Sequence, residues 1–178
     1  MKKILMIFIM MLSCSAIVYS QDVQSSKQGI EKGFKSFVEI GDVKDFIVKD
    51  SKIELLNSYG YQASPYVYCG LGLGLNYYYD RISDISMPIF AHVRMTPSKS
   101  IVTPYVDLKT GYAFFDVEGF FVSPSIGIRV GLGDNVGIYV GIGYSYLAET
   151  WLERGYKQKW ERFYDELNGW SLKFGFDF

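Results

Sequence analysis

Cysteine and histidine are scarce in this chain, and basic charge is not in excess. The 178 residues include two cysteines and one histidine. If an N-terminal leader is removed, Cys14 goes with it and only Cys69 remains, which excludes an intrachain disulfide. Loss of Lys2 and Lys3 with that leader leaves 16 basic against 19 acidic residues. We therefore expect no nucleic-acid partner.

Long hydrophobic runs are also missing beyond the N-terminus. No stretch of 18 apolar residues follows the leader, so we expect no transmembrane helix. Helical periodicity is equally rare, and Trp160–Leu167 is the segment in which it predicts one or two helical turns within a loop. If this chain resides in a membrane, it must cross as strands.

The N-terminus has the pattern of a secretory signal peptide. A basic start at Lys2 and Lys3 precedes the apolar run Ile4–Leu12, and Val18-Tyr19-Ser20 fits a cleavage site. We expect a signal peptide at 1–20, a periplasmic segment at 21–32 and one β-barrel domain at 33–178. The alternatives are a membrane anchor, for which the run is short, and a lipoprotein acylated at Cys14, for which Met11-Leu12-Ser13 is a poor lipobox.

The last residues carry the clearest structural signal. Trp170, Leu172, Phe174, Phe176 and Phe178 alternate with small or charged residues. A period of two predicts a strand with one apolar face. A closed membrane barrel needs such a strand to pair with its first one.

Seven further segments are strand-like, separated by turns and loops of alternating length. The tight connections are rich in Pro, Gly, Ser and Asn, as in the short periplasmic turns of outer-membrane barrels. The sequence therefore predicts an all-β fold, an eight-stranded antiparallel up-and-down transmembrane β-barrel. The expected strands are Phe34–Gly41, Ile53–Gln62, Tyr66–Tyr79, Met87–Met95, Ile101–Phe115, Gly119–Gly131, Val136–Glu149 and Gly169–Phe178.

The composition of the two strand faces decides between a soluble and a membrane barrel. One face is aliphatic at strand centres and aromatic at both ends, whereas the other is rich in Gly, Ser and charge. A soluble barrel would turn its apolar face inward and leave an outer surface of glycine and serine. Two aromatic girdles around an aliphatic band are typical of a bilayer-facing surface.

Inward-facing charges then indicate how the lumen is filled. The alternation predicts five basic and five acidic inward residues. Such a balanced set would brace a narrow interior, and eight strands are too few for a wide pore. A small ion or proton path through the network is the alternative. The predicted lumen charges are Lys35, Glu39, Glu54, Arg94, Asp107, Lys109, Arg129, Glu149, Lys173 and Asp177.

Several segments together resemble a known class of protein. These are Lys32–Ile40, Tyr59–Tyr66, Gly70–Tyr77, Met87–Ala91, Glu118–Gly127 and the terminal Phe178. In their order and spacing they resemble the small outer-membrane β-barrel proteins (porin family) of Gram-negative bacteria, and the Bacteroides-type versions most. This resemblance implies location in the cell outer membrane and no shared catalytic residues.

Enzymatic function has little support in the residues. His92 is predicted to face inward as a hydrogen-bonded lumen residue, and no second histidine, nucleophile motif or metal-ligand cluster accompanies it. Asp80, Asp84, Asp116 and Glu118 could hold a cation at the loop end, but solvated loop carboxylates are the simpler interpretation. We expect no enzyme activity, no catalytic residue, no metal and no cofactor.

The segment between the last two strands is the candidate binding surface. Exposed aromatics interleaved with Arg and Lys would suit a polysaccharide, lipopolysaccharide or protein, and we name Trp151, Tyr156 and Trp160 as its binding residues. Alternatively these side chains pack on one another.

We expect the protein to be a monomer with two other partners. These are outer-membrane lipid and, through the strand ending in Phe178, the barrel-assembly machinery. The function expected is structural or surface-interacting, with a narrow channel as alternative and a lipid A-modifying enzyme as second alternative.

Overall fold

The computed structural model describes residues 32–44, 51–79, 84–97, 100–132, 136–154 and 160–178. For 149–154 and 160–166 it describes the backbone alone. The predicted signal peptide at 1–20, and all but the last residue of the predicted segment 21–32, lie outside these ranges. No helix in the described ranges is long and apolar enough to cross a membrane.

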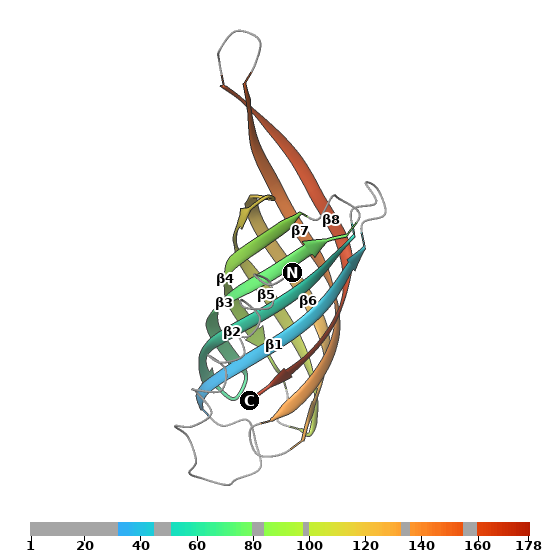
Figure 1. Ribbon diagram of the computed structural model, residues 1–178. Coiled ribbons are helices and arrows are strands. Elements are labelled where there is room, and N and C mark those ends of the chain that lie inside the picture. The colour runs from blue at the N-terminus through green and yellow to red at the C-terminus, as the bar shows by residue number, and fades with distance from the viewer. Residues whose placement is uncertain (1–31, 45–50, 80–83, 98–99, 133–135, 155–159) are drawn as a thin grey trace, which may run out of the picture.

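Eight antiparallel strands follow one another in chain order and close into a barrel (Figure 1). β8 pairs with β1, where Ser36 and Phe178 exchange backbone hydrogen bonds of 2.8 and 3.1 Å. This confirms the predicted fold class. The strands are β1 Gly33–Lys44, β2 Lys52–Ser64, β3 Val67–Tyr78, β4 Ile85–Met95, β5 Val102–Phe115, β6 Gly119–Gly131, β7 Gly137–Arg154 and β8 Trp160–Asp177.

The strand register fixes how steeply the strands tilt. A path followed from strand to strand through directly paired residues starts at Gly33 and returns to β1 at Val43, ten residues further along. Ten residues of about 3.3 Å make a stagger of about 33 Å, and eight strand spacings make a sheet about 38 Å wide across the strands, so the tilt is near 40°. The path runs through Gln62, Tyr68, Arg94, Asp107, Ser125, Gly143 and Ser171.

Side chains alternate between lipid-facing and lumen-facing positions, as the period of two predicts. In β8, Trp170, Leu172 and Phe174 are 46–61% exposed, whereas Ser171 and Lys173 are buried. The same alternation places the predicted aliphatic band outside, and its exposed members include Ile40, Leu71, Val106, Ile126, Val140 and Ile142. Exposed aromatics lie toward both rims, among them Phe34, Tyr61, Tyr77, Phe114 and Phe120. Such a surface suits lipid, so the barrel is a transmembrane one.

The last hairpin corrects one prediction. Trp160–Leu167, expected to form helical turns in a loop, is the first half of β8 and pairs with β7 as far as Arg154 opposite Trp160. β6 pairs with β7 only up to Glu149, and β1 pairs with β8 only up to Trp170. The ends of β7 and β8 therefore form a two-stranded ribbon that projects beyond the other strands (Figure 1).

Small differences in strand ends have local causes. β2 runs to Ser64, whose hydroxyl accepts hydrogen bonds from the backbone amides of Tyr66 and Val67 and closes the turn. The register shifts between Gln62 and Ser64. Pro88 lies at an interruption of the β3–β4 ladder and Pro124 at one of the β6–β7 ladder, without a change of register, because proline lacks the donor.

Candidate functional site

The lumen gathers the buried charges of the described chain. Nine of the ten predicted lumen charges are at most 6% exposed, and the tenth, Glu149, has no described side chain. Lys52 adds a buried cation that the sequence placed in a loop. The described lumen thus holds six basic and four acidic side chains, with Glu149 left out of the count. The nine are Lys35, Glu39, Glu54, Arg94, Asp107, Lys109, Arg129, Lys173 and Asp177.

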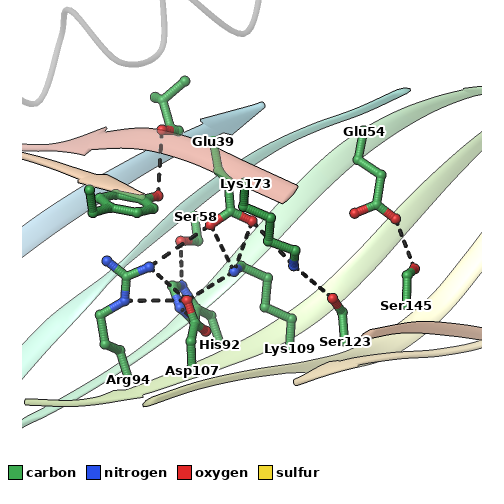
Figure 2. A network of polar contacts seen from close by, with 12 residues as sticks. Glu39, Glu54, Ser58, His92, Arg94, Asp107, Lys109, Ser123, Ser145 and Lys173 are labelled. Carbon is green, nitrogen blue, oxygen red and sulfur yellow. Dashed lines mark hydrogen bonds and ion pairs between the residues drawn. The ribbon is translucent and has the colours of Figure 1, made fainter. Parts of the chain in front are cut away.

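Two carboxylates organise the centre of the lumen (Figure 2). Lys109 Nζ lies 3.1 and 3.2 Å from the two oxygens of Glu39 and 3.0 Å from Asp107 Oδ2. Lys173 Nζ lies 3.4 Å from Glu39 Oε1 and donates to Ser123 Oγ at 2.7 Å. Because β1, β5, β6 and β8 all contribute, these contacts link opposite walls. We call Glu39, Arg94, Asp107, Lys109 and Lys173 the central ion cluster.

Arg94 joins this cluster to a layer of aromatic rings. Its Nε and Nη2 atoms donate to Asp107 Oδ2 at 3.3 and 2.6 Å. The centre of its guanidinium lies 4.3 Å from the Phe37 ring, 4.2 Å from Tyr105 and 4.1 Å from Tyr139. Three aromatic rings therefore surround the guanidinium in cation–π contacts, a setting in which arginine and lysine are not interchangeable. Phe37, Tyr68, Tyr105 and Tyr139, all buried, form the aromatic layer.

Beyond the central ion cluster, the loop end of the lumen is filled by apolar side chains. Val117 lies in the loop between β5 and β6, yet its side chain is fully buried among residues of the strands. Lys52 Nζ lies 2.9 Å from Glu54 and over the Tyr78 ring, so the loop end also contains a buried ion pair. The loop-end plug consists of Leu56, Tyr78, Phe90, Ala113, Val117, Phe121, Leu147 and Leu167.

Inward glycines make room for the lumen rings. A Cβ atom at Gly72 would collide with the Phe90 ring and lie 2.6 Å from the carbonyl oxygen of Asn57, and one at Gly175 would collide with the Tyr139 ring. The Gly70–Gly74 repeat of the sequence is therefore explained by ring packing inside a narrow barrel.

The turn end carries a third group of ions, which we call the turn-end trio. Asp177 accepts from Arg129 Nε at 2.7 Å and Arg129 Nη2 at 2.7 Å, and its Oδ2 lies 3.1 Å from Lys35 Nζ. One carboxylate therefore serves two cations. Beside the trio is a cavity of about 10 Å³, close to the room that one water molecule needs. Its lining residues are Lys35, Phe37, Gln62, Tyr68, Arg94, Thr96 and Arg129.

His92 lies within the lumen and between two partners. Its Nδ1 lies 2.7 Å from Ser58 Oγ, and its Nε2 lies 2.7 Å from Asp107 Oδ1. Serine, histidine and aspartate are the residue types of a hydrolytic triad. Here all three are at most 2% exposed, and none of them lines the turn-end cavity. The geometry fits a hydrogen-bonded brace, the role that the sequence predicts for His92, because no acyl substrate can approach the hydroxyl.

The structure describes the other sequence candidates only in part. Asp116 Oδ2 accepts from the backbone amide of Ile85 at 3.2 Å, Asp80 lies outside the described residues, and no described group of three or more His, Cys, Asp or Glu could hold a metal ion. Trp151 and Trp160 lie on the projecting ribbon without described side chains, and Tyr156 lies outside the described residues. These binding residues stay predictions.

Comparison with known proteins identifies the fold. No family model matches the sequence, and no curated protein matches it. The crystal structure of Neisserial surface protein A is similar, with a TM-score of 0.55 at 13% identity over 81% of this chain and 94% of that chain. A de novo designed transmembrane β-barrel matches at a TM-score of 0.48 and 14% identity, over 88% of this chain and 98% of that one. The fold is an eight-stranded transmembrane β-barrel. The identities are too low to carry more than this.

Proposed function

We propose that this chain is an outer-membrane β-barrel with a structural or surface-interaction role and a sealed lumen. The observation that carries the proposal is the layering of the interior. A central ion cluster lies between the loop-end plug and the aromatic layer, and its members meet partners on other strands at 2.6–3.4 Å. An interior so filled serves rigidity rather than diffusion.

Outer-membrane location is supported by the surface and by the topology. Aliphatic side chains cover the outer face of the described strands, with aromatics toward both rims. The connections at the end of the barrel near Phe178 are short where the structure describes them, as at the two-residue turn between Ser64 and Val67. Outer-membrane barrels place short turns on the periplasmic side and longer projections outside.

The projecting ribbon of β7 and β8 is the proposed interaction element. After Glu149 in β7 and before Trp170 in β8, neither strand pairs with a second strand among the described residues. Its residues Trp151 and Trp160, together with Tyr156 of the connecting segment, would supply aromatic contacts to a surface polysaccharide or protein. We propose no catalytic role, because the Ser58–His92–Asp107 arrangement is sealed.

Two measurements test this proposal. Planar-bilayer recordings of the refolded protein should show no stable conductance steps, whereas regular steps would favour the narrow channel instead.

The second measurement tests the ribbon with a triple variant that carries Trp151→Ala, Tyr156→Ala and Trp160→Ala. This variant should lose binding to cells or surface polysaccharide while it keeps heat-modifiable gel migration. Trp170→Ala is the matched control, because that tryptophan is 61% exposed on β8 within the lipid-facing surface. Unchanged binding by the triple variant would show that these aromatic residues of the ribbon are not the binding residues.

A further inference from the structure

Among the described side chains, the turn end of the lumen has more positive than negative charge. Three cations, Lys35, Arg94 and Arg129, line the cavity there, and no carboxylate is among its lining residues. Their carboxylate partners are Asp177, shared by Lys35 and Arg129, and Asp107, shared by Arg94 and Lys109, while Arg94 also lies 3.9 Å from Glu39. Each carboxylate thus faces at least two cations.

Two donors at this cavity have no partner in the described part of the chain, Arg94 Nη1 and the hydroxyl of Tyr68. Arg94 is 2% exposed, and its Nε and Nη2 atoms are used by Asp107, whereas Nη1 meets no hydrogen-bond acceptor among the described residues. A buried donor on a charged group is costly when it is unsatisfied. Two further polar lining groups are engaged, since Gln62 Nε2 donates to the Ser64 carbonyl and Thr96 Oγ1 to the Pro65 carbonyl.

A buried excess of like charge is unfavourable unless a counter-charge neutralises it. The cavity has the room of about one water molecule, which favours a monatomic ion over a larger one. We propose that this cavity is a site for one monatomic anion of the chloride class, held by Lys35, Arg129 and the free Nη1 atom of Arg94. The anion would complete the charge pairing at the turn end of the lumen and hold the rims of β1, β4 and β6 together.

Lys35→Gln is the most direct test of the proposed anion site. It removes one cation from the cavity, but Asp177 keeps three contacts of 2.7–3.0 Å from Arg129, so no buried carboxylate loses its last partner. The variant is therefore expected to fold. Lys44→Gln is the matched control, because it removes the same charge from the same strand at a side chain that is 63% exposed.

The experiment compares halide with gluconate at equal ionic strength. The urea midpoint of the refolded wild-type barrel should rise with chloride or bromide, and so should that of Lys44→Gln, whereas Lys35→Gln should show no halide-specific rise. Crystals of the wild type grown with bromide should show one anomalous peak in the cavity. An equal halide response in Lys35→Gln, or a cavity without bromide, would overturn the proposal. If Lys35→Gln fails to fold, the presence or absence of the bromide peak in wild-type crystals tests the proposal by itself.

Discussion

Lys109 and Glu39 are 70 residues apart in the sequence, yet the Lys109 ammonium contacts both carboxylate oxygens of Glu39 across the lumen, at 3.1 and 3.2 Å. The contact joins β5 to β1, which are not neighbours in the sheet. Backbone ladders bind each strand only to the next one. Contacts of this kind are what couple opposite walls of the barrel.

Glu39→Gln tests the central ion cluster. It removes the negative charge that meets Lys109, Lys173 and, at 3.9 Å, Arg94. Lys109 and Arg94 then keep Asp107, whereas Lys173 keeps only the Ser123 hydroxyl among its described contacts. Loss of one partner from a buried network costs about 3–5 kcal/mol, so we expect the free energy of unfolding in urea to fall by that amount. Asp42→Asn on the same strand is the control, because Asp42 is 48% exposed, and it should change stability by less than about 0.5 kcal/mol. Equal effects of the two variants would contradict the bracing role.

Arg94→Lys separates charge from shape. The variant keeps a cation beside Asp107 but loses the two-donor contact and the guanidinium contacts with the rings of Phe37, Tyr105 and Tyr139. Desolvated cation–π contacts contribute about 2 kcal/mol. We expect Arg94→Lys to lose at least about 2 kcal/mol of unfolding free energy, measured by urea titration. A fully stable lysine variant would show that charge alone is needed.

Gly72→Ala tests the packing of rings against inward glycines. The added methyl group would collide with Phe90, and overpacking of this kind costs about 1–3 kcal/mol. Phe90→Leu in the same chain should restore part of the loss, although the methyl group also lies 2.6 Å from the Asn57 carbonyl. Gly33→Ala is the control, because a Cβ atom there meets nothing within 4 Å. Similar losses at both glycines would argue against a filled lumen.

The alternation of side chains predicted which face of each strand is buried. Lys173 between Leu172 and Phe174 is a clear case, because in lipid the two faces of a strand have opposite polarity. Beyond the membrane both faces of a strand meet water, so the period of two disappears. This is why Trp160–Leu167 was wrongly predicted to be helical.

Which charges meet could not be predicted in the same way. The alternation gives the face of Glu39 and Lys109 but not their height in the barrel, which depends on the ten-residue stagger of the register. Lys52 was missed for a related reason. It follows Asp50 and Ser51 and so resembled a loop residue, whereas its pairing with Glu54 draws it into the end of β2.

The outward orientation of the apolar face is the central claim, and Cys69 tests it most directly. Cys69 is an exposed free cysteine on β3, beside the buried Tyr68, and is the single cysteine of a chain that starts after residue 20. A nitroxide attached to Cys69 in the barrel refolded into phospholipid bilayers should be relaxed by oxygen, which concentrates in lipid, and poorly by a water-soluble nickel chelate. Stronger relaxation by the nickel chelate than by oxygen would place this face in water and contradict the account.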